Sequence, residues 1–286
     1  MVNLLLIYNG SIRILKSSGV ENAAFEVLHI IKKHIEIDKY EMAFAEKEID
    51  DTTAKAIYDD IDRRVKNEPL QYILGEWEFM SLPFKVRKGV LIPRPETEIL
   101  VDTALKLIKG REENTEAFDL CTGSGCIAVS LAKYNKEVSL TAIDSSNEAL
   151  ALANENAELN NVTGRVKTVK GDVLNGYFNY CKENSLDIIV SNPPYVKTGD
   201  ISSLQKEVSL YEPKLALDGG EDGLMFYRTI IKGWKNSLKT EGFMCFECGE
   251  GQAEDIEKLF LENGFVDIKP AEDYNGIIRV VTAKNL

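Results

Sequence analysis

The residues with the clearest potential for chemistry are Asn192-Pro193-Pro194-Tyr195, which end an apolar stretch that begins at residue 186. A residue before proline is biased toward extended backbone, and the two prolines have no N–H group to donate inside the loop. The side-chain oxygen of Asn192 and the backbone carbonyl of Pro193 can therefore accept both hydrogens of one planar –NH2 group. The loop indicates an enzyme that holds an amide or an aromatic amine.

A carboxamide nitrogen is a weak nucleophile because its lone pair is delocalised into the carbonyl group. Two fixed acceptors on its N–H groups would hold the amide plane, aim the nitrogen at an electrophile and stabilise the positive charge that develops. We therefore predict catalytic roles for Asn192, Pro193 and Tyr195, and substrate binding by these residues and Pro194. The Tyr195 ring would stack on a planar acceptor, and a core tyrosine with a satisfied hydroxyl is the alternative. A carboxylate in place of the amide would bring its acceptor oxygens against the acceptor oxygens of the loop. Glutamine or asparagine is therefore the expected substrate.

A second group of residues indicates a bound cofactor. The segment 119–128 reads Asp-Leu-Cys-Thr-Gly-Ser-Gly-Cys-Ile-Ala, a glycine turn that runs from a strand into a helix. Gly123 and Gly125 would let the backbone approach a ligand, and the helix start offers free N–H donors. Asp144 ends the next predicted strand, about 20 residues later, where a carboxylate can accept hydrogen bonds from ribose hydroxyls. A nucleoside-containing cofactor follows, unless the turn serves only to pack the strand against the helix.

The identity of this cofactor rests on neighbouring residues, because the spacing of Gly123, Gly125 and Ala128 also fits NAD or FAD. The Asn-Pro-Pro-Tyr loop favours S-adenosylmethionine, with S-adenosylhomocysteine as product. Asp172 closes the third predicted strand and could accept the adenine amino hydrogens, or it could cap a helix. The predicted cofactor-binding residues are Cys121, Thr122, Gly123, Ser124, Gly125, Asp144, Asp172, Val173 and Asn192.

The hydrophobic pattern divides the chain into three parts. Residues 1–75 show helical periodicity and predict a small helical bundle that recognises a substrate protein, with Phe25 among its apolar positions. Residues 76–95 predict a linking β-hairpin, and 96–286 the catalytic domain. Apolar runs separated by helices predict an α/β fold, in which a mostly parallel seven-stranded sheet ends in two strands joined without a helix, one of them antiparallel. The predicted strands span residues 117–122, 139–144, 166–172, 186–192, 242–248, 265–270 and 277–283.

The composition limits the class of partner. A net charge of -12 argues against binding duplex DNA through its phosphates and favours a protein partner. No apolar run reaches membrane-spanning length and no signal peptide is recognised, so we expect a cytoplasmic, monomeric protein without direct nucleic-acid or membrane binding. Five cysteines suggest reduced thiols. Cys245 and Cys248 should point to opposite faces of a strand, with His29 and His34 far away in sequence, so core thiols are predicted and no metal site.

Several segments resemble one family, the release-factor glutamine N5-methyltransferases of the HemK/PrmC type. Asn-Pro-Pro-Tyr alone is shared with adenine-N6 methyltransferases, whereas Pro-Leu-Gln-Tyr-Ile-Leu-Gly and Ile-Pro-Arg-Pro-Glu-Thr-Glu look specific to this family. Cys121 departs from the family pattern, which usually has glycine there, as do Cys248 in place of Ile and Ile278 in place of Asp. The matching segments are residues 68–76, 91–98, 119–125, 192–195, 212–217 and 276–281.

The resemblance implies a Rossmann-like class I methyltransferase that methylates the glutamine of the Gly-Gly-Gln motif in peptide-chain release factors. The helical N-terminal domain would help to grip that protein. Residues 122–125 and Asp144 would bind the cofactor, Asn192 would hold the acceptor amide, and residues 193–195 would line the substrate slot. Arg94 would border the cofactor pocket or form an interdomain ion pair. The open alternatives are an adenine-N6 methyltransferase acting on nucleic acid and an NAD-binding oxidoreductase or scaffold.

Overall fold

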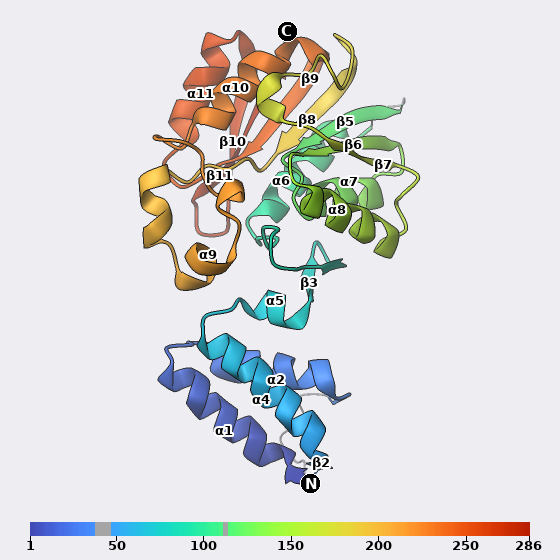
Figure 1. Cartoon of the computed structure of the whole chain (residues 1–286). Helices are drawn as coiled ribbons and strands as arrows, with labels where there is room; N and C mark the ends of the chain where they lie inside the picture. Colours follow the sequence, from blue (N-terminus) through green and yellow to red (C-terminus); the bar gives the residue numbers. More distant parts are fainter. Residues whose placement is uncertain (38–46, 111–113) are drawn as a thin grey trace. The chain divides into compact units, whose positions relative to one another are not determined.

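The computed structural model describes residues 1–37, 47–110 and 114–286, which form two compact units (Figure 1). The first unit comprises Met1–Glu76 together with Gln205–Tyr211. The second comprises Trp77–Leu204 and Glu212–Leu286. Within the described residues, no helix is both long enough and apolar enough to cross a membrane.

The first unit is built from amphipathic helices, as the helical periodicity predicts. Asn3 caps the first helix by accepting hydrogen bonds from two backbone N–H groups, and Asp50 caps a later one through the N–H of Thr53. Phe25 is 51% exposed rather than packed in the bundle, and Val27 and Ile30 are buried instead. The unit contains α1 (Leu4–Ser17), α2 (Ala23–His34), α4 (Asp51–Val65), α5 (Leu70–Leu74), α9 (Lys206–Tyr211) and the antiparallel pair β1 (Val2–Asn3) and β2 (Glu48–Ile49).

The helix α9 joins this unit from a distant part of the sequence. Arg64 of α4 is buried and pairs with Glu26 of α2 at 2.5 Å and with Glu207 of α9 at 2.9 Å. The Tyr211 hydroxyl donates to the carbonyl of Lys66 at 2.8 Å. A buried guanidinium needs such partners, so Arg64 fixes α9 against the helices from the start of the chain.

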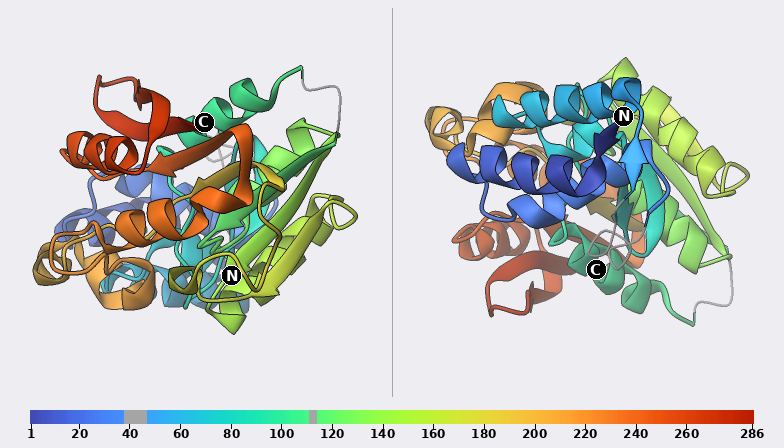
Figure 2. Two further views of the ribbon diagram at one scale, coloured as in Figure 1. Left: turned by 90° about the horizontal axis from the view of Figure 1, so that it is seen from above. Right: turned by 90° about the horizontal axis from the view of Figure 1, so that it is seen from below.

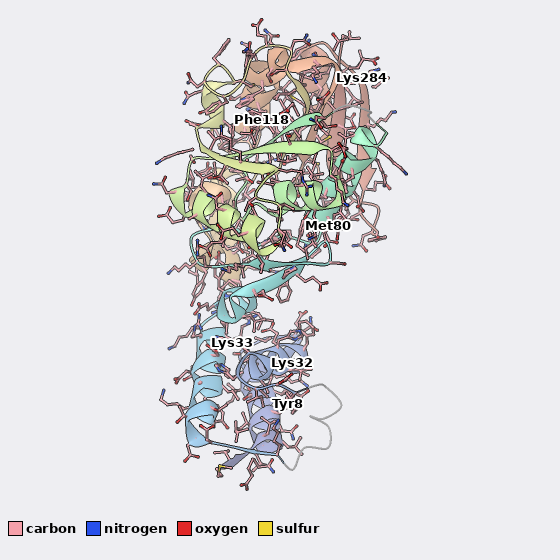
Figure 3. The ribbon with its side chains drawn as sticks, turned by 90° about the vertical axis from the view of Figure 1, so that its right-hand side faces the viewer. Tyr8, Lys32, Lys33, Met80, Phe118 and Lys284 are labelled. Carbon is pink, nitrogen blue, oxygen red and sulfur yellow. The ribbon has the colours of Figure 1, made fainter. Side chains whose placement is uncertain are left out.

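The predicted hairpin is confirmed, with short strands. It consists of β3 (Glu76–Phe79) and β4 (Leu82–Lys85). Met80, labelled in Figure 3, and Ser81 form the two-residue turn with φ values of 51° and 55°. Positive φ at both central residues matches the twist of a hairpin. The segment 86–95, which the sequence assigned to the same hairpin, contains no strand.

The second unit contains the predicted seven-stranded, mostly parallel sheet, in the order β10-β11-β9-β8-β5-β6-β7. β11 runs antiparallel to both of its neighbours, as expected for two final strands joined without a helix. The strands are β5 (Thr115–Leu120), β6 (Val138–Asp144), β7 (Val166–Lys170), β8 (Leu186–Ser191), β9 (Leu238–Glu247), β10 (Phe265–Glu272) and β11 (Ile278–Asn285).

Helices cover both faces of this sheet (Figure 2). One face packs against α6 (Thr97–Ile108), α7 (Cys126–Tyr134) and α8 (Asn147–Leu159), and the other against α10 (Met225–Trp234) and α11 (Ala253–Glu262). Phe118, labelled in Figure 3, lies in the second core, with 6.0 Å between its ring centroid and that of Trp234. Cys245 packs in the first core and Cys248 in the second, as the strand alternation predicts.

Candidate active site

A cavity of about 690 Å³ opens in the second unit where the carboxyl ends of β5, β6, β7 and β8 meet. Parallel sheets bind ligands at this edge. Of the residues predicted for the cofactor and the substrate, those that line the cavity are Cys121, Thr122, Gly123, Ser124, Asp144, Asp172, Val173, Asn192 and Pro194. Among the described residues, Gly125, Pro193 and Tyr195 do not belong to this lining.

The two glycines of the turn do different things. Gly123 has a φ of 55°, and a methyl group added there would lie 4.0 Å from Val90, its nearest neighbour, so the backbone faces open space. Gly125 has a φ of 78°, and a methyl group there would lie 2.9 Å from the Cβ and 3.0 Å from the Cα of Ala153 in α8. Gly125 is therefore required for helix packing. The sequence predicted that both glycines let the backbone approach a ligand, and only Gly123 has open space for such an approach.

The turn begins with a residue in the left-handed region. Cys121 has a φ of 61°. Glycine reaches this conformation without steric cost, which accounts for the glycine that the family usually has here. For Cys121, contact between its Cβ and the following carbonyl costs about 1 to 2 kcal/mol.

Asp119 holds the glycine turn through hydrogen bonds, a role that was not predicted from the sequence. It is fully buried, and its Oδ2 accepts hydrogen bonds from the Thr122 hydroxyl at 2.5 Å and from the N–H of Ala128 at 3.3 Å. No described residue bonds its Oδ1. Burial raises the pKa of Asp119 to about 7, against the effect of these hydrogen bonds.

Asp144 joins the turn to the next strand. Its Oδ2 accepts the N–H of Gly123 and its Oδ1 the N–H of Ser146, both at 2.9 Å. Burial raises the pKa of this carboxyl, while the backbone hydrogen bonds lower it. A carboxylate oxygen can accept more than one hydrogen bond, so both oxygens retain lone pairs toward the cavity.

Asp172 is a cap, the alternative that the sequence left open. It accepts hydrogen bonds from the N–H of Leu174 at 3.0 Å and from Asn175 at 3.3 Å, and so begins the short helix η1 (Val173–Asn175). The same residue lines the cavity, so capping and ligand contact are compatible.

Asn156 of α8 is the main residue that sequence reasoning missed. Its side chain is fully buried, accepts the N–H of Lys85 at 2.7 Å, and donates to the carbonyls of Ser124 at 2.9 Å and Lys85 at 3.1 Å. It thereby ties the hairpin strand β4 to the glycine turn. The available signal was a polar residue at helical spacing on the face that carries Leu152 and Ala153.

The Asn-Pro-Pro-Tyr loop follows β8. Asn192 faces the cavity, and its Nδ2 donates to the Thr97 hydroxyl at 3.2 Å. The carbonyl of Tyr195 accepts from Gln252 at 3.0 Å, and the Tyr195 hydroxyl lies 3.5 Å from an oxygen of Glu247. Burial raises the pKa of Tyr195, and the negative charge of Glu247 adds to the shift. These contacts match the core tyrosine with a satisfied hydroxyl, which the sequence offered as the alternative to a ring that stacks on the acceptor.

Glu247 lies beside this loop. It is 2% exposed, and burial raises its pKa to about 7, although the nearby hydroxyls of Thr97 and Tyr195 act to lower it. Within the described chain, its Oε2 has no hydrogen-bonding partner.

Arg94 fills the first of the two roles considered from the sequence, at the border of the cavity, and not the interdomain one. It lines the cavity, and its guanidinium donates to the buried carboxylate of Glu212 at 2.5 Å. Both residues belong to the second unit, so this ion pair does not link the two units.

Comparisons with known proteins decide the family. The PrmC N-terminal domain matches residues 8–75 and the methyltransferase small domain matches residues 96–212. The release factor glutamine methyltransferase of Thermodesulfovibrio yellowstonii is 43% identical, over 93% of this chain and 92% of that protein. The chain belongs to the release factor glutamine methyltransferase family. Another member, from Geobacter sulfurreducens, is 41% identical over 93% of this chain and 91% of its own length.

One solved structure shares the fold of this chain. The hMettl16 catalytic domain superposes with a TM-score of 0.57 at 16% identity, covering 90% of this chain and 89% of that chain. At this identity the likeness concerns the fold alone. Membership of the release factor glutamine methyltransferase family gives no support to the oxidoreductase and adenine-methyltransferase alternatives, and the predicted resemblance to this family is confirmed.

Proposed function

We propose that this chain transfers a methyl group from S-adenosylmethionine to the side-chain amide nitrogen of the glutamine in the Gly-Gly-Gln motif of peptide-chain release factors. The observation that carries the proposal is the position of Asn192, whose carboxamide shares one cavity with the glycine turn and with Asp144. A nucleoside site and an amide-recognising group thus face the same space. The helical first unit would contribute to recognition of the release factor.

The cavity suits the cofactor in size and chemistry. Its volume of about 690 Å³ lies within the range of small-molecule sites. Open space at Gly123 would admit the ligand against the backbone, and the free lone pairs of Asp144 would accept the ribose hydroxyls. Asp172 and Val173 would border the adenine. When bound, S-adenosylmethionine supplies an electrophilic methyl group.

The Asn192 loop would supply the acceptor site. The Asn192 Oδ1 and the backbone carbonyl of Pro193 would each accept one N–H of the glutamine amide, which orients its nitrogen and stabilises positive charge as the new N–C bond forms. The amide proton leaves after transfer, so no strong base is required. A glutamate would present oxygens to these oxygens, at a cost of about 1 to 3 kcal/mol for each buried group left unpaired.

Methyl transfer by the purified chain to a purified release factor tests the proposal, with the modified residue located by mass spectrometry. Asn192→Ala should lower kcat/KM more than about 100-fold, roughly 2.7 kcal/mol, and leave S-adenosylhomocysteine affinity nearly unchanged. A titration should show that S-adenosylhomocysteine binds and NADH does not. Near-normal turnover by Asn192→Ala would remove this residue from the mechanism, and modification elsewhere than the Gly-Gly-Gln glutamine would overturn the substrate assignment.

A further inference from the structure

The Asn-Pro-Pro-Tyr loop has few backbone groups with which to hold itself in place. Pro193 and Pro194 carry no N–H group, so neither can donate a hydrogen bond to the rest of the protein. Their rings also fix φ, and the residues that precede them, Asn192 and Pro193, are biased toward extended backbone. A segment with so few free dihedral angles moves as one piece. A displacement of Tyr195, at the end of the loop, should therefore also displace Asn192.

Gln252 holds the Tyr195 end of this loop from outside. Its Nε2 donates to the carbonyl of Tyr195 at 3.0 Å and to the carbonyl of Gly223 at 3.3 Å, and its Oε1 accepts the N–H of Gly249 at 3.0 Å. A carbonyl can only accept and a backbone N–H can only donate, so these partners allow one orientation of the Gln252 carboxamide. Both hydrogens of this amide are engaged by backbone oxygens.

The place of Gln252 in the fold makes it a firm support. It directly precedes α11, and its carbonyl accepts the N–H of Ile256 at 3.1 Å. Ile256 and Phe260 of this helix are buried in the core on one face of the sheet. The Gln252 side chain thus connects a packed helix to the loop that carries Asn192.

A second segment packs against the rear of the same loop. A methyl group added at Gly219 would lie 2.7 Å from the Cα of Tyr195 and 2.8 Å from the carbonyl oxygen of Pro194. Both are backbone atoms, so no side chain fits between this segment and the loop. Gln252 bonds the same segment at Gly223, and its carboxamide therefore joins the segment to the loop.

We propose that Gln252 is a positioning residue for methyl transfer, because its hydrogen bond to Tyr195 fixes the loop that presents Asn192 to the acceptor amide. This inference rests on the proposed function and deepens it. The two acceptors that would hold the substrate amide, Asn192 Oδ1 and the Pro193 carbonyl, both belong to this loop, and their placement relative to the methyl donor determines the rate. Gln252 is not among the described residues that line the cavity, so it acts through the loop and not by contact with a ligand.

Gln252→Glu tests the inference with almost no change of shape. The introduced carboxylate can still accept the N–H of Gly249, but it cannot donate, so it turns an oxygen toward the carbonyls of Tyr195 and Gly223. The kcat for the release factor should fall at least about 10-fold, the size expected for one lost hydrogen bond. Affinity for S-adenosylhomocysteine should stay within about 2-fold, because the cofactor side of the cavity is unchanged.

Asn263→Asp is the matched control on the same helix. The Nδ2 of Asn263 donates to the carbonyl of Leu259 at 2.8 Å, so the change from amide to acid again removes a donor from a backbone carbonyl. Asn263 lies at the far end of α11, away from the loop. This variant should lose a comparable amount of stability and keep kcat within about 2-fold.

A spectroscopic readout reports on the loop directly and needs no acceptor protein. Residues 195 and 196 form the only Tyr-Val pair in the sequence, so labelling with carbonyl-¹³C tyrosine and ¹⁵N valine gives one amide–carbonyl correlation. The Tyr195 carbonyl signal should shift in Gln252→Glu and stay near its wild-type position in Asn263→Asp. Should Gln252→Glu fail to fold, Gln252→Met asks the same question, since methionine is of similar length and has no amide.

The outcomes separate this inference from the proposed function. If the wild-type protein methylates the release factor but Gln252→Glu, or Gln252→Met in its place, keeps kcat within about 2-fold, the positioning role is wrong and the function stands. If the wild-type protein transfers no methyl group but the Tyr195 signal moves as predicted, the function fails and the hold of Gln252 on the loop stands. An unmoved Tyr195 signal in Gln252→Glu, or an equal loss of kcat in Asn263→Asp, would also overturn the inference.

Discussion

Alanine substitution at the two glycines of the turn should separate folding from ligand binding. For Gly125→Ala, a left-handed φ of 78° costs about 1 to 2 kcal/mol. The added methyl group also meets Ala153 at 2.9 Å, and the Cα of Ala153, at 3.0 Å, is helix backbone that cannot turn away. Overpacking of this kind costs about 1 to 3 kcal/mol. The free energy of unfolding should therefore fall by about 2 to 5 kcal/mol.

Gly123→Ala is the matched comparison. Its φ of 55° carries a similar backbone cost, but its methyl group meets nothing closer than 4.0 Å. The loss of stability should stay at about 1 to 2 kcal/mol. Because the methyl group projects where the ligand backbone contact is proposed, affinity for S-adenosylhomocysteine should fall at least about 10-fold, or about 1.4 kcal/mol.

Calorimetry measures both effects. Gly125→Ala should lower Tm by roughly 5 to 15 °C, clearly more than Gly123→Ala does. Relative to its own decrease in Tm, Gly123→Ala should lose more affinity for S-adenosylhomocysteine than Gly125→Ala. If Gly125→Ala is as stable as the wild-type protein, or if Gly123→Ala is the less stable of the two, the division of roles is wrong.

Two further predictions concern buried polar groups. Asn156→Ala removes the hydrogen bonds that this side chain makes to Lys85 and Ser124, so the free energy of unfolding in urea should fall by about 3 kcal/mol. Binding of S-adenosylhomocysteine should also weaken. An unchanged urea midpoint would contradict this role. Asp119 has a folded pKa of about 7 against an ordinary value of 3.8, so its stabilising contribution is complete below pH 3.8 and is lost as the pH rises through 7. The stability of Asp119→Asn relative to the wild-type protein should therefore rise by on the order of 4 kcal/mol between about pH 4 and pH 8, at about 1.4 kcal/mol per pH unit. Measurements of Tm against pH for both proteins test this. Parallel curves would show that the carboxyl is not buried as described.

Much of the fold follows from the sequence because its signals are local. The helix α8 follows one of the predicted strands, and its start can be read from the sequence, since Ser146 caps it and apolar residues recur at helical spacing. The strands end where polar residues replace the apolar runs, so the sequence alone places Asp144 and Asn192 at strand ends on one edge of the sheet.

What the sequence could not supply depends on contacts between distant segments. Nothing near Gly125 reveals that Ala153 blocks a side chain there, and nothing near Thr97 reveals that Asn192 lies within hydrogen-bonding distance of it. The attachment of α9 to the first unit through Arg64 is of the same kind. Tertiary packing decides such positions, and local periodicity carries no information about it.

The most direct test of the account compares two acceptors. Purified chain and labelled S-adenosylmethionine are incubated with a release factor and with the variant of that release factor whose Gly-Gly-Gln glutamine is changed to glutamate. The oxygen acceptors of the Asn192 loop predict label on the glutamine protein only, at a rate at least about 100-fold above the variant. Comparable label on both proteins would show that recognition of an –NH2 group does not drive this enzyme.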